Sequence, residues 1–307
     1  MTTRAFAPGT VANLGPGLDI LGLALKGAGD TVFVERSAGR DVTIRSSGHP
    51  DIPSETMRNT AGIAAVRVLE RAGAGGTGLA IDVSKGLPLS AGQGGSAASA
   101  AAAAVAVNAL LGSPLAKADL LDACLAAEET VAGRHADNVA AALFGGVVLV
   151  RALDPPDVVA LRYPEDLVVV LVQPDQRLRT EEARAALPRS VDRSVAVAQA
   201  AQVGALVAAL ARGDLALLAR SIEDRIAEPA RAPLLLGFSE AKTAALNSGA
   251  LGCSISGAGP AVFAFAAGEE SASRVGQAMV AAYAGRGVAA RARARRIDAQ
   301  GARVLEP

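Results

Sequence analysis

The sequence predicts a protein of mixed class, α+β or α/β, folded in two domains. Its 307 residues are more than one typical domain holds and suit two domains of roughly 100–200 residues each. Hydrophobic residues make up 51% of the chain, which is enough to bury substantial cores. Strand-like and helix-like segments are interleaved in both halves, as in these two fold classes. We place the boundary near residue 155, where the run DPP breaks the chain.

Alternation of apolar and polar residues marks the strands of the first half, as in half-buried strands. The clearest examples are TVFVE at 31–35 and DVTIR at 41–45, which follow an N-terminal stretch of turns and short strands. Helical spacing begins at residue 59 and ends at the glycine-rich stretch 73–78. We therefore expect strands at 31–35, 41–45, 79–83 and 147–151, and helices at 59–72, 96–111, 115–131 and 139–143.

The second half opens with LVVVLV at 167–172, a continuous apolar run that predicts a fully buried strand. Helical patterns follow it, and a second glycine-rich loop lies at 252–260. We expect further strands at 262–266 and 287–297, and helices at 180–186, 195–210, 215–226, 238–247 and 272–284.

The composition argues against several classes of protein. The formal net charge is zero and aromatic residues make up only 3%, so neither a basic surplus nor a stacking platform points to nucleic acid. The histidines and cysteines lack the spacing of metal ligands, so no zinc site is expected. Cys124 and Cys253 lie far apart among small residues, and we expect them to be reduced core residues.

Nothing in the sequence predicts secretion or membrane insertion. The N-terminal MTTRAFAPGT lacks the apolar stretch of a signal peptide. The alanine-rich run at 97–107 is interrupted by Ser99 and falls short of a bilayer span of ~20 residues. We therefore expect a buried helix in a cytoplasmic protein.

Three glycines stand directly before this alanine-rich run, in the segment KGLPLSAGQGGSAASAAAAA at 85–104. Without a Cβ, Gly92, Gly94 and Gly95 let backbone N–H groups turn toward one point. The start of the helix at Ser96 adds unpaired N–H donors and a partial positive charge. The combination is suited to binding phosphate.

Three alternatives compete for this loop. A Walker loop requires a lysine after the last glycine, and none is present. A dinucleotide-binding fingerprint fits Gly92, Gly94 and Ala97, but LPLSA separates it from the preceding strand and the expected acid ~20 residues on is missing. A flexible loop ahead of a core helix is the remaining alternative.

Three further segments narrow the choice. Residues 7–25 read APGTVANLGPGLDILGLAL, residues 133–146 read GRHADNVAAALFGG, and residues 252–265 read GCSISGAGPAVFAF. Together with PLSAGQGGSAA at 88–98, they resemble in order the motifs of the GHMP small-molecule kinases. ANLGPGLD, the H-x-D-N-V-A of 135–140 and DRIAEPARAPLLLGF at 224–238 resemble the homoserine-kinase branch. The resemblance runs from about residue 5 to residue 266.

This resemblance implies a two-domain α+β fold. Residues 1–155 would form an ATP-binding domain like the second domain of ribosomal protein S5, and residues 156–307 a ferredoxin-like domain. It implies an ATP-dependent phosphotransferase, with Mg²⁺, that converts L-homoserine to O-phospho-L-homoserine in threonine biosynthesis. A cytoplasmic homodimer is implied as well.

The resemblance also assigns the ATP side. Family members usually carry GLGSSA where this chain has Gly92 to Ala97, so Gly95 replaces the first serine and Ser96 matches the second. Ser96 could contact phosphate or Mg²⁺, and Glu128 or Glu129 would be the acidic Mg²⁺ ligand, Glu128 matching better. The residues expected around the ATP phosphates are Pro88, Leu89, Ser90, Ala91, Gly92, Gln93, Gly94, Gly95, Ser96, Ala97 and Ala98.

The substrate side follows from the same motifs. By resemblance, Asn13 and Asp19 would bind the ammonium group of homoserine. Arg184 and Arg231 would bind its carboxylate, because arginine makes bidentate bonds to carboxylates. The remaining expected residues are His135 and Gly257 in the pocket and Asn138 and Thr180 near the hydroxyl, with Asn138, Arg184 and Thr180 as the catalytic set.

Each of these residues also has an ordinary structural interpretation. Asn13 and Asp19 could be turn residues, Asn138 a helix cap, and the arginines surface charges. His49 lies in GHPD, which resembles the family motif locally, but Ile52 replaces the asparagine and we treat it as a chance match.

The motif at 133–138 departs from the family pattern in two places. Ala136 replaces the usual proline, and Arg134 is unusual. Asp137 corresponds to the base of related kinases outside the homoserine branch. We expect instead direct in-line attack by the substrate hydroxyl, carried by positioning and electrostatics.

Three other functions stay open from sequence alone. The chain could phosphorylate another alcohol such as mevalonate, a sugar or shikimate, although paired arginines beside Asp19 suit a charged acceptor better. It could be a non-catalytic sensor of ATP and a metabolite, but the presence of Ser96 and Asn138 argues against this alternative. It could bind a dinucleotide, which the missing acid disfavours.

Overall fold

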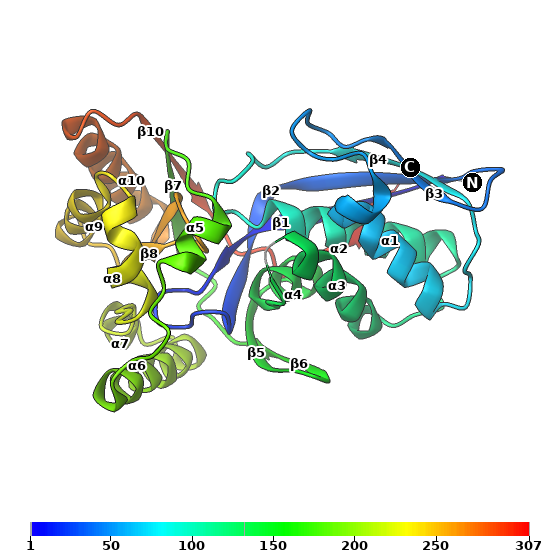
Figure 1. Cartoon of the computed structure of the whole chain (residues 1–307). Helices are drawn as coiled ribbons and strands as arrows, with labels where there is room; N and C mark the ends of the chain where they lie inside the picture. The colour runs from blue at the N-terminus through cyan, green and yellow to red at the C-terminus, as the bar shows by residue number, and fades with distance from the viewer. Residues whose placement is uncertain (1, 132, 307) are drawn as a thin grey trace.

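The computed structural model describes residues 2–131 and 133–306, and its strands form two sheets (Figure 1). In the first sheet the order is β11-β1-β2-β4-β3, with β5 paired to β2 and β6 paired to β5. The pairs are antiparallel except β3 with β4, which the chain connects through a helix. The strands are β1 (Thr2–Ala12), β2 (Leu21–Arg36), β3 (Val42–Ser46), β4 (Leu79–Ser84), β5 (Val147–Leu153), β6 (Pro156–Leu161) and β11 (Arg303–Val304).

Four helices pack on the first sheet around an alanine-rich centre: α1 (Thr60–Arg71), α2 (Gly95–Leu110), α3 (Leu121–Val131) and α4 (Asp137–Phe144). The central helix α2 contacts the other three as well as β1 and β2. Its alanines from 97 to 104 are all fully buried. Small side chains let several elements approach α2 closely, which explains the composition of this segment. Short 3₁₀ turns precede α1 and α3, as η1 (Thr56–Arg58) and η2 (Lys117–Leu120).

The second sheet is antiparallel, in the order β10-β7-β9-β8. Its central strand β7 is buried on both faces, as LVVVLV predicts, because Val168 and Val170 enter one core and Val169 and Leu171 another. The strands are β7 (Leu167–Pro174), β8 (Cys253–Ile255), β9 (Val262–Ala267) and β10 (Ala290–Arg295). The helices are α5 (Thr180–Ala185), α6 (Arg193–Arg212), α7 (Leu215–Ala219), α8 (Ala227–Arg231), the 3₁₀ turn η3 (Ala232–Leu234), α9 (Phe238–Asn247) and α10 (Gly268–Gly285).

Two sequence expectations about secondary structure are wrong. The N-terminal stretch forms two long paired strands, β1 and β2, and a register shift at Pro8 and Thr10 accommodates the residues that suggested turns. The helix expected at 215–226 ends at Ala219, and Asp224 accepts the backbone N–H groups of Ile226 and Ala227 in a turn instead of continuing that helix.

Strand pairing also bears on the domain boundary. β6, residues 156–161, pairs with β5 in the first sheet, and β11 at the C-terminal end of the chain pairs with β1. The junction between the two sheets therefore follows Leu161, a few residues beyond the boundary expected near residue 155, and the last strand returns to the first sheet. The bounds expected for the two domains, 1–155 and 156–307, stay a prediction.

Helix α6 is the one helix of residues 2–131 and 133–306 that could cross a membrane by length and composition alone, with a mean hydropathy of 1.7. A single such helix is weak evidence for a membrane span. In this structure α6 contributes Leu206, Ala209 and Leu210 to the core shared with the second sheet.

Candidate active site

A cavity of about 430 Å³ lies where the glycine loop of the first domain faces α5, α8 and the second glycine-rich loop. Almost every residue expected at the site lines it, from Asn13 to Gly257. Ala97 and Ala98 do not line it, because both are buried inside α2. His49, treated as a chance match, is also absent from the lining.

The glycine loop requires glycine at positions 92 and 94 because neighbouring backbone and side-chain atoms occupy the space of a Cβ. Gly94 has a φ of +65° and precedes α2, and a Cβ there would lie 1.9 Å from Oγ1 of Thr10 and 2.8 Å from Oδ1 of Asn138. Gly92 has a φ of +69°, and a Cβ there would lie 2.6 Å from the carbonyl oxygen of Ser256. The loop thus aims the free N–H groups of α2 into the cavity while it packs against both domains.

A buried ion pair anchors the first turn of α2. Lys85 pairs with the fully buried Asp30. The Lys85 Nζ also donates to the carbonyl of Gly95 at 2.9 Å and to Oγ of Ser99 at 3.1 Å, and Asp30 accepts from the N–H of Gly86. These bonds satisfy both buried charges and fix the loop ends relative to the helix.

Ser96 and Glu128 form the arrangement expected of a cation site. Oγ of Ser96 donates to Oε1 of Glu128 at 3.1 Å, whereas Oε2 of Glu128 is buried and has no partner among the described residues. Burial raises the pKa of Glu128 to about 7. Glu129 is exposed and pairs with Arg134 at 3.6 Å, so Glu128 is the better candidate ligand. Hydroxyl and carboxylate oxygens suit Mg²⁺, and an unpaired buried oxygen fits a bound cation.

The side chains of Arg184 and His135 meet at the carboxylate of Asp19. Arg184 donates to both carboxylate oxygens of Asp19, at 2.9 and 3.3 Å, and Nδ1 of His135 lies 3.3 Å from the same carboxylate. Asn13 accepts from the N–H of Asp19 and donates to the carbonyl of Gly257 at 3.0 Å. Asn13 and Asp19 both have positive φ, near +71° and +63°, so they are turn residues as well as site residues.

Arg231 lies deeper in the same pocket, 2% exposed. It donates to the carbonyl of Ala183 at 3.1 Å and to that of Gly257 at 2.9 Å. Burial, and then the charge of Arg184, lower the pKa of Arg231. Two guanidinium groups that repel each other in a buried pocket suit an anionic ligand, because a carboxylate between them removes the repulsion.

Asn138 and Asp137 begin α4 beside the glycine loop. Oδ1 of Asn138 accepts from the hydroxyl of Thr10 at 2.6 Å, and the N–H of Asn138 donates to Asp137 at 2.9 Å. Burial, and then the nearby Asp19, raise the pKa of Asp137 to about 7. Thr180 faces the cavity from the first turn of α5. The structure brings these three residues together with the glycine loop.

Several contacts at and beside the cavity were not predicted from the sequence. Thr10, which is fully buried, orients Asn138, although it lies within the quoted segment APGTVANLG. Gln93 was expected only as part of the loop, yet it donates to Oε1 of Gln173 in β7 at 3.1 Å and so joins the loop to the second sheet. The segment between β3 and the first turn of α1 also lines the cavity, through Ser47, Ile52, Pro53, Arg58, Asn59 and Thr60.

A glycine loop before a helix, the hydroxyl of Ser96 beside the carboxylate of Glu128, and charged side chains of both signs line one cavity, as the chemistry of a small-molecule kinase requires. Known proteins agree with this class. The family model described as "GHMP kinases N terminal domain" matches residues 59–146, and "GHMP kinases C terminal" matches residues 206–285.

Relatives that align over most of the chain give the finer grouping. The homoserine kinase of Arabidopsis thaliana is 43% identical over 92% of this chain and 79% of its own length, and that of Chlorobium phaeovibrioides is 43% identical over 92% of both. The crystal structure of homoserine kinase from Cytophaga hutchinsonii has a TM-score of 0.95 and 41% identity, over 99% of this chain and 97% of that one. The chain belongs to the homoserine kinase family of the GHMP kinases and is an ATP-dependent kinase.

Proposed function

We propose that the chain transfers the γ-phosphoryl group of ATP to the side-chain hydroxyl of L-homoserine, giving O-phospho-L-homoserine. The observation that carries this proposal is the charge pattern of the cavity. Asp19 supplies an anion, Arg184 and Arg231 supply cations, and all three lie in one cavity with the glycine loop. An α-amino acid zwitterion complements this pattern, whereas a neutral alcohol would leave the buried Arg231 without an anionic partner.

The substrate would enter by replacing contacts that the site residues now make with one another. Its ammonium group would bind Asp19 and the Oδ1 of Asn13, and its carboxylate would draw Arg184 away from Asp19 toward Arg231. The orphaned Nε of Arg184, buried without a partner in the part of the chain described, is available for this carboxylate. Asp19 and Arg184 are thus paired with each other until the substrate would separate them.

The ATP would lie along the glycine loop, with its phosphates at the start of α2 and its nucleoside toward the cavity residues of the segment 47–60. The N–H groups of α2 would bind the phosphate oxygens. Mg²⁺ would be held by Ser96 and Glu128 and would neutralise charge on these oxygens. The hydroxyl of homoserine would then approach the γ-phosphate in line, oriented by Asn138 and Thr180.

Asp137 is suited to a secondary role in this reaction. Its raised pKa means that a fraction of the carboxyl groups is protonated near neutral pH, when it would be a hydrogen-bond donor rather than a base. Its contact with the N–H of Asn138 supports the first turn of α4. We therefore keep the base-free mechanism, in which positioning and electrostatic stabilisation supply most of the rate.

The test of this function is ADP release by the purified protein with Mg²⁺ and ATP across a panel of acceptors. L-homoserine would be compared with D-homoserine, L-serine, L-threonine, mevalonate, galactose and shikimate, and the product identified by mass spectrometry. Release that depends on L-homoserine supports the proposal. ADP release only with another acceptor would be consistent with a kinase but would contradict the proposed zwitterion pocket. ATP binding without ADP release for any acceptor would favour a non-catalytic sensor.

We also propose that the enzyme is a cytoplasmic homodimer that acts in threonine biosynthesis. Cys124 and Cys253 are buried free thiols, which suits a reducing compartment. Much of the apolar helix α6 lies at the surface, where Val197 is 63% exposed, and a second copy would cover it. The molar mass in solution, measured by light scattering, distinguishes the dimer from the 30.6 kDa monomer.

A further inference from the structure

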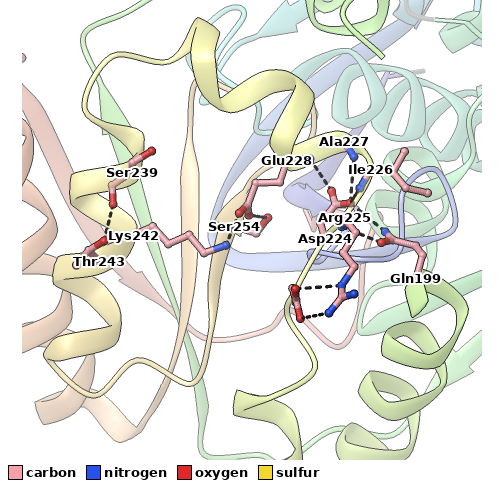
Figure 2. A network of polar contacts seen from close by, with 11 residues as sticks. Gln199, Asp224, Arg225, Ile226, Ala227, Glu228, Ser239, Lys242, Thr243 and Ser254 are labelled. Carbon is pink, nitrogen blue, oxygen red and sulfur yellow. Dashed lines mark hydrogen bonds and ion pairs between the residues drawn. The ribbon is translucent and has the colours of Figure 1, made fainter. Parts of the chain in front are cut away.

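Gln199 is a buried polar residue in the largely apolar helix α6. Both the nitrogen and the oxygen of its side-chain amide form hydrogen bonds. Its Nε2 donates to the carbonyl of Pro16 at 2.8 Å and to Oδ1 of Asp224 at 2.9 Å. Its Oε1 accepts from the N–H of Arg225 at 2.9 Å. Figure 2 shows Gln199 reaching Asp224 and Arg225 from its helix. One side chain thus joins the segment 13–19 to the segment 224–231.

Asp224 fixes the second of these segments. The side chain is 7% exposed, and its carboxylate accepts from the backbone N–H groups of Ile226 at 2.8 Å, Ala227 at 3.0 Å and Glu228 at 2.9 Å (Figure 2). These bonds begin α8, a helix of five residues that is too short to be stable alone. The last residue of α8 is Arg231, so Asp224 sets where this arginine lies.

Glu228 holds α8 from its other side. It pairs with Lys242 of α9 and accepts from the hydroxyl of Ser254 in β8 at 2.6 Å (Figure 2). Ser254 is buried and leads into the loop whose Gly257 carbonyl accepts from Arg231. Arg231 is therefore fixed relative to the second sheet without any help from Gln199. The bond from Gln199 adds the connection to the first domain.

The first segment carries the anionic end of the substrate pocket. Its residues run from Asn13 to Asp19 in a tight loop, where the N–H of Gly17 donates to the carbonyl of Asn13. Gly15, at a φ of +84°, lies so close to the chain just before the second segment that a Cβ would be 2.9 Å from the carbonyl oxygen of Ile222. The first segment therefore packs beside the start of the second, and Gln199 bonds to both.

We propose that Gln199 and Asp224 are positioning residues that set the spacing between Asp19 and Arg231. This inference rests on the proposed function. The two charged residues would bind opposite ends of one small zwitterion, so their separation must match its ammonium-to-carboxylate distance. A misplacement of ~1 Å can cost on the order of 100-fold in an enzyme site. The pair thereby determines selectivity for an α-amino acid, while ATP binds elsewhere in the cavity.

A purely structural role for Gln199 predicts a different outcome. A methionine of similar volume would fill the same space in α6 and suit its apolar surroundings. If only packing matters, that change leaves kinetics unaltered. If the amide positions the two segments, Gln199→Met raises the KM for L-homoserine and leaves the KM for ATP unchanged. The split between the two KM values separates positioning from general destabilisation.

The experiment compares Gln199→Met with wild type and with Gln202→Met. Gln202 lies on the same helix and bonds to Glu223 at 3.1 Å at the surface, so it is a matched control outside the proposed contact. We expect about a tenfold higher KM for L-homoserine in Gln199→Met, because buried donors and acceptors lose their partners. The KM for ATP should stay within about twofold, and Gln202→Met should behave as wild type.

A second variant keeps the test decisive if Gln199→Met does not fold. Asp224→Asn keeps the shape of the side chain but places an NH₂ group against at least one backbone donor, so we expect the same selective rise in KM. An unchanged KM for L-homoserine in either folded variant, or an equal rise in both KM values, would overturn the inference. Absence of homoserine-dependent turnover in wild type would instead overturn the proposed function.

Discussion

Among single residues, Asn138 is the one that we expect to affect the rate of phosphoryl transfer most directly. Its amide oxygen is held by the buried hydroxyl of Thr10, which points the rest of the side chain into the cavity beside the glycine loop. Asp137 is adjacent but buried, and its pKa is raised to about 7. The two neighbours therefore differ in what they can do: Asn138 orients a hydroxyl, and Asp137 supports the turn.

We predict that Asn138→Ala lowers kcat by about 100-fold or more, because an orienting contact at the reacting group is lost. Asp137→Asn should lower kcat by less, on the order of tenfold. Steady-state kinetics with saturating ATP and L-homoserine measure both. A larger loss in Asp137→Asn than in Asn138→Ala would contradict the base-free mechanism and make Asp137 the base.

Glu128 and Glu129 are neighbours in sequence but not in environment. Glu128 is buried against Ser96 with one unpaired oxygen, and Glu129 is exposed beside Arg134. We predict that Glu128→Gln raises the Mg²⁺ concentration required for half-maximal activity by about tenfold, since a charged ligand is removed. Glu129→Gln is the matched control and should need no more Mg²⁺ than wild type. The reverse result would move the metal ligand to Glu129.

At the scale of elements, the glycine loop and α2 form the phosphate site together. Their glycines are not equivalent. Gly94 has a positive φ and no room for a Cβ, whereas Gly95 lies within α2, and a Cβ there would be 3.3 Å from the flexible end of Lys85. The replacement of a family serine by Gly95 therefore leaves the path of the loop intact.

We predict that Gly94→Ala abolishes ATP binding or lowers its affinity by at least about 100-fold, because the Cβ would displace Thr10 and strain the backbone. Gly95→Ser should retain activity within about threefold, since only a side-chain terminus must shift. Titration of ATP by calorimetry measures both affinities. Normal ATP affinity in Gly94→Ala would show that the loop does not bind the phosphates.

The elements also show what the sequence can and cannot predict. Central strand β7, helix α9 and the glycine loop could be predicted because their signals are local: an apolar run, helical spacing, and glycines before alanines. The bond of Gln93 to Gln173 and the anchor of Lys85 on Asp30 could not, because residues 80 and 55 positions apart meet only through packing.

The predicted site residues depended on a different kind of information. Asp19, Arg184 and Arg231 could be named because four spaced motifs resemble one family, and the structure places all three in one cavity. Gln199 lies outside these motifs, and Asp224 lies in the quoted motif at 224–238 without a role assigned to it from the sequence. The turn at Asp224 was not predicted, because the spacing of apolar residues at 215–226 is that of a helix. The bonds from backbone N–H groups to the Asp224 carboxylate leave no periodic pattern in the sequence.

At the scale of the whole molecule, two buried carboxyl groups make stability depend on pH. The pKa values of Glu128 and Asp137 are each raised to about 7 by burial, above their values of about 4 in an unfolded chain. Between pH 4 and 7 the folded state therefore binds more protons than the unfolded state. Their contribution to stability is fully present below pH 4, falls as pH rises through 7, and then levels off.

We predict that the ligand-free protein loses Tm between pH 5 and pH 7.5 and that Asp137→Asn loses less. The losses of Tm in the two proteins should differ by a few °C, since 1 kcal/mol shifts Tm by about 2–4 °C in a chain of comparable size. Thermal denaturation followed by circular dichroism across this range measures it. Parallel curves for the two proteins would show that Asp137 does not carry the raised pKa.

The central claim of this account is that one pocket beside the phosphate loop binds both charges of an amino acid. The most direct test is kcat/KM for L-homoserine against two analogues that each lack one charged group, 4-hydroxybutanoate and 3-aminopropan-1-ol. We predict a loss of at least about 100-fold for each analogue, because Asp19 or the arginine pair is left unpaired. Turnover of either analogue at a rate close to that of L-homoserine would contradict the account.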